Sequence, residues 1–289
     1  MLDTWFSSGL FPFSAMGWPN MDSPDLKAFF PGHLLETGGD IIFFWVARMV
    51  MMSLELTDKL PFETVFFHPM VKDEVGSKMS KSKGNVIDPL EVIDSCTLKT
   101  LVAKIENSTL PPNEQKKSIK AKTAMFPEGI PACGTDALRF TMLAYMVQSS
   151  INLDVKRVVG YKEFCNKIWN VNKFAHFNFP EGFVANPAGV ASMQEHLSLS
   201  DKWILTRLSK VIKSSNQNFE DYKFGDMVQD LYDFWWKELC DVYTEVSKPQ
   251  LKTGSAQQQE ATLNTLYTCL DVGLRLLSPT MPFLTEELY

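Results

Sequence analysis

Apolar residues after Gly134 recur at the spacing of an α-helix, and this limits the second half of the chain to packed helices. In four stretches the apolar side chains lie three and four positions apart, which places them on one helical face. These stretches are residues 161–169, 204–219, 228–243 and 263–277. Because most connections are short, apart from a loop at 179–198, they predict a helical bundle. Ser200 is the predicted N-cap of the second helix.

The first 94 residues show an α/β pattern instead. Residues 33–35 predict a short buried strand that ends at the polar turn 37–40, and residues 65–71 predict a second strand. Residues 41–56 between them predict one long helix, which is apolar nearly all round and therefore sandwiched between other elements. Ligands of open α/β sheets collect where strands end, so both turns that follow these strands are candidate nucleotide sites.

Residues 94–133 are polar and rich in lysine, and we interpret them as a surface insertion with short helices at 98–105 and 113–123. The predicted fold class is α/β followed by all-α. The expected domains are residues 1–94, the α/β part; 95–155, an insertion and connecting segment; and 156–289, the helical part.

Composition excludes some classes of protein. The chain has 289 residues and a net charge of −6, so its overall electrostatic field does not favour the binding of nucleic acid. Its five cysteines include no pair at metal-ligand spacing, which indicates a reducing compartment, the cytosol, and no structural metal site. A local basic stripe, which includes Lys162, Lys167 and Lys173, suits a polyanion that docks on one side. Ordinary solvated helix faces remain the alternative.

The octet 78–85 reads Lys-Met-Ser-Lys-Ser-Lys-Gly-Asn and follows the second predicted strand. Gly76 and Gly84 let the backbone turn sharply at its two ends. Such a loop can aim ammonium and hydroxyl groups at a polyphosphate whose charge grows as a bond breaks. A solvated basic turn is the alternative for lysine-rich runs in general.

This octet resembles the signature loop of the class I aminoacyl-tRNA synthetases. Four further blocks resemble successive blocks of the valyl branch of that family, in the same order and at similar spacing. They are Leu-Asp-Thr-Trp-Phe-Ser-Ser-Gly at 2–9, Thr-Gly-Gly-Asp-Ile-Ile-Phe-Phe-Trp-Val-Ala-Arg-Met at 37–49, Gly-Thr-Asp-Ala-Leu-Arg-Phe at 134–140 and Phe-Cys-Asn-Lys-Ile-Trp-Asn at 164–170. The likeness runs nearly end to end, and the insertion resembles that of the eukaryotic cytosolic form.

The resemblance implies a Rossmann-like catalytic part followed by a helical anticodon-binding bundle. It also implies a two-step reaction, in which valine and ATP, with Mg²⁺, give valyl-adenylate and pyrophosphate before transfer to tRNA(Val). In this family pattern Lys78 and Lys81 are the expected catalytic lysines at the triphosphate. Met79, Ser80 and Ser82 are expected to bind the nucleotide beside them.

Gly38 and Asp40 are expected at the ATP ribose, although Asp40 could instead N-cap the helix that follows. Trp5, Ile41 and Trp45 are the expected wall of the valine pocket, with core packing as the alternative. The resemblance also implies that Lys162, Lys167 and Lys173 contact tRNA phosphates. His33 and His68 are interpreted as structural.

Two features keep other readings open. The second signature of the family, a His-Ile-Gly-His-like string, is not found in this sequence, and the editing domain that interrupts the fold in this family is not found either. The chain therefore resembles the C-terminal half of the catalytic domain followed by part of the anticodon-binding bundle. We therefore expect that this polypeptide alone neither activates valine nor charges tRNA, which valine-dependent ATP–pyrophosphate exchange would test. An isoleucyl- or leucyl-tRNA synthetase and a non-catalytic tRNA-binding module are the competing functions.

Overall fold

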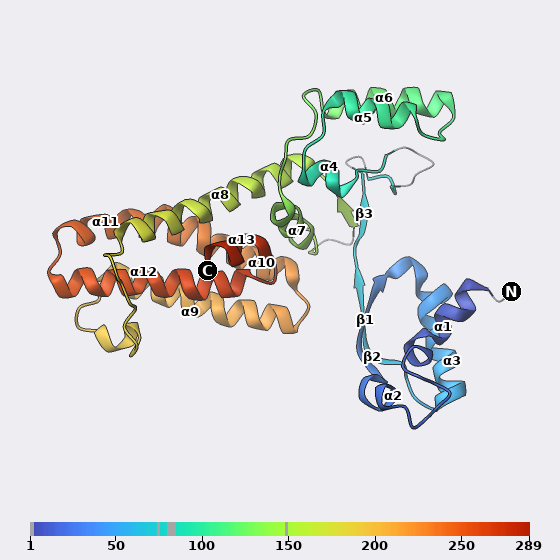
Figure 1. The fold of residues 1–289 in the computed structure, drawn as a ribbon, viewed down its shortest axis with the longest axis horizontal. Coiled ribbons are helices and arrows are strands. Elements are labelled where there is room, and N and C mark those ends of the chain that lie inside the picture. The colour runs from blue at the N-terminus through green and yellow to red at the C-terminus, as the bar shows by residue number, and fades with distance from the viewer. Residues whose placement is uncertain (1–2, 74–75, 80–84, 148–149) are drawn as a thin grey trace. The chain divides into compact units, whose positions relative to one another are not determined.

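The structure is a computed structural model that describes residues 3–73, 76–79, 85–147 and 150–289. It divides into two compact units, Met1–Met70 and Val71–Tyr289 (Figure 1). In the described residues, no helix combines the length and the apolar character that crossing a bilayer needs. The predicted domain boundaries at residues 94 and 155 separate functional parts of the chain and stay predictions.

The first unit is built on two parallel strands. Its elements are α1 (Thr4–Ser14), α2 (Pro24–Phe29), β1 (Gly32–Gly38), the 3₁₀ helix η1 (Gly39–Ile41), the π-helix η2 (Ile42–Val46), α3 (Ala47–Thr57) and β2 (Phe62–His68). β1 and β2 pair from Gly32 opposite Phe62 to Gly38 opposite His68. The helical segment η1–η2–α3 connects them, and α1 packs against both η2 and α3. Both strands therefore present their carboxyl ends at the same edge.

Several details of this unit differ from the prediction. The predicted helix 41–56 is a 3₁₀ turn, a π-helix and an α-helix in succession, because contacts of Trp45 and Phe44 with α1 fix the first turns. The predicted sandwiching is wrong as well, since Phe43 is 83% exposed. The first strand is also longer than residues 33–35 and is not fully buried, with Leu34 exposed. The second strand, predicted at 65–71, instead begins at Phe62 and ends at His68, directly before Pro69, which cannot donate a backbone hydrogen bond.

The second unit begins with a small mixed region. Its elements are β3 (Met70–Lys72), α4 (Pro89–Ile93), α5 (Leu98–Glu106), α6 (Pro112–Met125), α7 (Thr135–Ala144) and β4 (Ser150–Asn152). β3 pairs with β4, and α5 packs against α6 as a helical hairpin. The predicted pair of insertion helices is thus confirmed, although α5 ends one residue later than predicted and α6 begins one residue earlier and ends two residues later.

The rest of the second unit is the predicted helical bundle. Its elements are α8 (Val155–Asn178), the 3₁₀ helix η4 (Val190–Met193), α9 (Leu199–Glu220), α10 (Phe224–Tyr232), the π-helix η5 (Asp233–Tyr243), α11 (Thr244–Thr253), α12 (Ala256–Leu277) and α13 (Pro282–Leu288). One apolar cluster, which includes Phe164, Leu231 and Trp235, joins α7, α8, α9, α10, η5 and α12. Figure 1 shows the long helices α8, α9 and α12 side by side.

The bundle corrects two further predictions. Ser198, not Ser200, is the N-cap of α9, because Ser198 and Asp201 exchange side-chain and backbone hydrogen bonds in a capping box. The predicted helix 228–243 changes from α to π at Asp233. Asp201 is fully buried and also accepts a hydrogen bond from Tyr243 Oη at 2.6 Å, so this cap ties α9 to η5.

Candidate functional site

The carboxyl ends of β1 and β2 carry the first group of predicted site residues. β1 ends at Gly38, and the 3₁₀ turn Gly39–Ile41 that follows contains Asp40. Gly38 itself is the N-cap of this turn and Ile41 is the N-cap of η2. The alternative that Asp40 N-caps the helix is therefore wrong, and its exposed carboxylate stands at the strand end, where α/β folds bind ligands.

Gly38 is packed too closely to carry a side chain without rearrangement. A Cβ at this position would lie 2.8 Å from Asp40 Oδ1 and 3.0 Å from Met70 Sδ. The neighbouring Gly39 differs, because a Cβ there would meet no atom within 4 Å. Close approach of backbone and carboxylate thus explains glycine at 38.

One pair at this edge was missed by sequence reasoning. Glu36 on β1 and His68 on β2 are hydrogen-bonded through Oε1 of the carboxylate and Nδ1 of the imidazole, and both side chains are partly exposed. His68 lies opposite Gly38 in the strand register. The parallel pairing of two segments that are 32 residues apart brings them together, so only the strand register could have revealed the pair.

The three predicted valine-pocket residues lie on neighbouring elements of the first unit. Trp5 is on α1, Ile41 ends η1 and Trp45 lies in η2. All three are partly buried. The Trp45 indole N–H donates to the Ser8 carbonyl at 3.2 Å, and the Trp5 ring lies 6.2 Å from that of Phe44. α1 and η2 therefore form one aromatic surface that contains Trp5 and Trp45, and Ile41 directly precedes η2.

Lys78 and Met79 belong to the second unit. Lys78 pairs as an isolated antiparallel bridge with Lys72 at the end of β3. Met79 is partly buried and packs against the apolar cluster around Val92 and Ile151. The other predicted members of this loop, Ser80, Lys81 and Ser82, lie outside the described residues.

A buried carboxylate joins the residue before the octet to the last residue of the octet. Asp73 is 8% exposed, and its Oδ1 accepts the Ser77 N–H at 2.7 Å. Its Oδ2 accepts the Asn85 side-chain amide at 2.8 Å, and the same amide reaches the Lys78 carbonyl at 3.3 Å. Asp73 and Asn85 therefore fix the backbone of Lys78, a role that the sequence pattern did not reveal.

The predicted tRNA-binding lysines all lie on α8, in different environments. Lys173 is exposed and Lys162 is partly buried. Lys167 forms an ion pair with Asp241 on η5, and its Nζ lies 4.1 Å from the centre of the Trp236 ring. An ammonium held in this way already has an anionic partner, so Lys162 and Lys173 are the stronger candidates for phosphate contacts.

The cysteines show no sign of catalytic activation. Burial raises the pKa of Cys165 and of Cys240 to about 12, because desolvation disfavours the thiolate. Burial likewise raises the pKa of the Cys96, Cys133 and Cys269 thiols. Among the described residues, no three His, Cys, Asp or Glu side chains gather as a metal site would require.

Comparison with protein families gives two matches along the chain. Residues 1–154 match the model described as tRNA synthetases class I (I, L, M and V). Residues 201–289 match the model described as the anticodon-binding domain of tRNA ligase.

Similar proteins agree with both matches. Valine–tRNA ligases of Mus musculus and Homo sapiens are each 55% identical over 290 residues, and that of Schizosaccharomyces pombe is 48% identical. The match covers 100% of this chain but 23% of the mouse protein, so the chain spans about a quarter of that relative's length.

Two solved structures share the fold at low sequence identity. Methionyl-tRNA synthetase of Mycobacterium tuberculosis bound by methionyl-adenylate gives a TM-score of 0.62 at 19% identity, over 95% of this chain and 47% of that one. A LeuRS–tRNA–LeuAMS complex of Agrobacterium radiobacter gives 0.61 at 16% identity, over 99% and 31%.

Proposed function

We propose that this chain, which belongs to the class I tRNA synthetases of the I, L, M and V group, is a functional part of a valine–tRNA ligase. In this role it contributes to ATP-dependent formation of valyl-adenylate and to transfer of valine to tRNA(Val). The observation that carries the proposal is 55% identity to valine–tRNA ligases along the whole chain. Isoleucyl and leucyl specificity is the less supported alternative.

For the ATP side we propose two groups of residues. Gly38 lets the backbone approach the ribose closely, and the exposed Asp40 carboxylate accepts hydrogen bonds from ribose hydroxyls. Lys78, with Lys81, places ammonium groups at the triphosphate and stabilises the charge on departing pyrophosphate. Met79, Ser80 and Ser82 complete this part of the nucleotide site.

Mg²⁺ would accompany ATP and neutralise charge on its phosphate oxygens.

The proposed contacts with valine and with tRNA rest on the chemistry of these two ligands. Valine offers an apolar side chain without hydrogen-bonding groups, so the aromatic surface of Trp5 and Trp45 with Ile41 selects it by shape. On α8, Lys162 and Lys173 neutralise tRNA phosphates, and Lys167 joins them if its ion pair with Asp241 opens. Five free thiols agree with the cytosol as the proposed compartment.

A hybrid enzyme tests this proposal. In the hybrid, the 290-residue matched segment of the mouse valine–tRNA ligase is replaced by this chain, at 55% identity. We expect valine-dependent ATP–pyrophosphate exchange at a rate comparable to that of the mouse enzyme, and weaker exchange with isoleucine or leucine. A hybrid that folds, as judged by circular dichroism, but does not exchange with valine would contradict the proposal.

Two glycine substitutions in the hybrid test the ribose site. Gly38→Ala would place a Cβ 2.8 Å from Asp40 Oδ1 and displace the carboxylate. Loss of one charged hydrogen bond to ribose is expected to raise the KM for ATP about tenfold. Gly39→Ala is the matched control, because nothing lies within 4 Å of its Cβ. Equal KM values for ATP in the two variants would contradict the proposed contact between Asp40 and the ATP ribose.

A further inference from the structure

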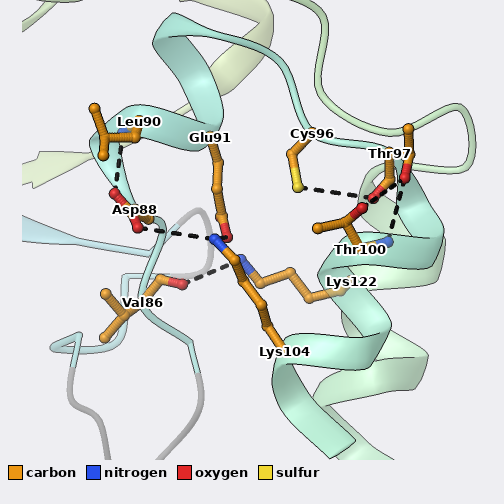
Figure 2. Close-up of polar contacts among 9 residues, drawn as sticks. All are labelled: Val86, Asp88, Leu90, Glu91, Cys96, Thr97, Thr100, Lys104 and Lys122. Carbon is orange, nitrogen blue, oxygen red and sulfur yellow. Dashed lines mark hydrogen bonds and ion pairs between the residues drawn. The ribbon is translucent and has the colours of Figure 1, made fainter. Parts of the chain in front are cut away.

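The α5–α6 hairpin contacts the chain just beyond the octet through one buried lysine. Lys122 on α6 is 6% exposed, and its ammonium donates to the carbonyl of Val86 at 3.2 Å. Val86 follows Asn85 directly in the chain. Figure 2 shows the Lys122 side chain extending from the helix toward this carbonyl.

A second contact holds the hairpin beside α4. Lys104 on α5 binds Glu91 on α4 at 2.8 Å, and Glu91 is 7% exposed. The same ammonium lies 3.9 Å from Asp88, which caps α4 by accepting the Leu90 N–H at 3.0 Å (Figure 2). The hydrogen bond to Glu91 is the main reason why the pKa of Lys104 is raised. Two lysines of the hairpin, Lys104 and Lys122, thus contact the segment 86–91.

Burying Lys122 carries a cost that its one hydrogen bond to a carbonyl does not readily offset. Desolvation lowers the pKa of Lys122, while the nearby Glu91 acts in the opposite direction. An apolar side chain of similar length in such a place is often neutral or stabilising. Stability alone is therefore a weak reason for an ammonium at this position.

The contact between α6 and the segment that follows the octet is not completely filled by side chains. A cavity of about 740 Å³ lies here, and Asp73, Asn85 and Lys122 are among its lining residues. Because this part of the contact is not filled by side chains, the hydrogen bond of Lys122 has more influence on where Val86 lies.

The contacts of Asn85 carry this restraint to Lys78. Its amide joins Asp73 Oδ2 and the Lys78 carbonyl, and Asp73 also accepts the Ser77 N–H. A displacement of Val86 would move the adjacent Asn85 and loosen both contacts.

We propose that Lys122 is a positioning residue: it fixes Val86 and, through Asn85 and Asp73, the backbone of Lys78, the lysine proposed to act on the triphosphate. The insertion hairpin is then a support for the backbone of Lys78 rather than a passive surface addition. This inference rests on the proposed function, but the restraint on the backbone can be measured without catalysis.

Amide hydrogen exchange on the 289-residue chain tests the restraint directly. The amides of Asp73, Gly76 and Ser77 all donate hydrogen bonds within this turn. Lys122→Met keeps the length and apolar stem of the side chain but removes its ammonium. We expect these amides to exchange about tenfold faster in this variant, as befits the loss of one charged hydrogen bond. Lys122→Arg is expected to restore slow exchange, and Lys116→Met, at an exposed position of α6, to leave it unchanged.

The same variants in the hybrid test the consequence for the reaction. Lys122→Met is expected to lower kcat of valine-dependent exchange roughly tenfold with an unchanged KM for valine, because the lysine backbone is misplaced rather than removed. The thermal midpoint should stay equal or rise, which a purely structural role would not give, and Lys122→Arg should recover kcat.

The outcomes separate the two proposals. Unchanged amide exchange in Lys122→Met would overturn the restraint, and faster exchange with unchanged kcat would overturn its role in the reaction. A hybrid that is inactive with the unaltered chain would refute the proposed function and with it this catalytic role, and amide exchange would still decide whether Lys122 holds the loop.

Discussion

Lys78→Ala in the hybrid is expected to lower kcat for valine-dependent ATP–pyrophosphate exchange by about 100-fold, the usual effect of removing one fixed donor at developing charge. The KM for valine should change little, because the proposed role of this ammonium is at the phosphates. The backbone of Lys78 is held by Lys72 and by the Asn85 amide, so its replacement should leave the turn intact. Initial rates of pyrophosphate exchange measure the effect.

The control for this substitution is Lys116→Ala, at an exposed position on α6. It removes the same charge from the same unit and should leave kcat within experimental error. Equal rates for Lys78→Ala and the unaltered hybrid would exclude Lys78 from pyrophosphate stabilisation.

Phe164→Ala is expected to destabilise the helical bundle by about 3–5 kcal/mol, the range for a fully buried phenylalanine that leaves a cavity. Phe164 has no exposed surface, and its ring lies 5.3 Å from that of Phe140 and 4.9 Å from that of Tyr232. The substitution therefore removes contacts among α7, α8 and α10. Urea unfolding followed by circular dichroism gives the change in free energy of unfolding.

Phe177→Ala provides the comparison on the same helix. Phe177 lies near the end of α8 and is 88% exposed, so its removal creates no cavity. We expect a change below about 0.5 kcal/mol, as for surface substitutions in general. Similar losses in the two variants would mean that the apolar face of α8 is not the one packed in the bundle.

Helical periodicity made the bundle predictable, because apolar positions repeat every three or four residues and must face a shared core. The first insertion helix was predictable for the same reason, whereas the second was predicted as a polar helix after the break at Pro111-Pro112. The π-helices were not, since the contact of Trp45 with Ser8 that accompanies η2 joins residues 37 positions apart. The N-cap of α9 was misplaced because Ser198 and Ser200 look alike in sequence, and only Asp201 distinguishes them.

The candidate site, like the fold, was predictable only in part. Strand ends and a lysine-rich turn could be located from the sequence, because glycine and polar residues follow short apolar runs. The side chains that hold this turn could not. Asp73 with Asn85, and Lys122 with Val86, are paired by the fold across 12 and 36 positions, and no local pattern indicates such partners. Glu36 with His68 belongs to the same class.

Formation of valyl-tRNA by the hybrid is the most direct measurement of the central claim, because it needs amino acid activation and tRNA binding together. With ATP, valine and tRNA(Val), the account predicts valyl-tRNA at an initial rate comparable to that of the mouse enzyme, and its loss in Lys78→Ala. A correctly folded hybrid that forms no valyl-tRNA would contradict the assignment of this chain to a valine–tRNA ligase.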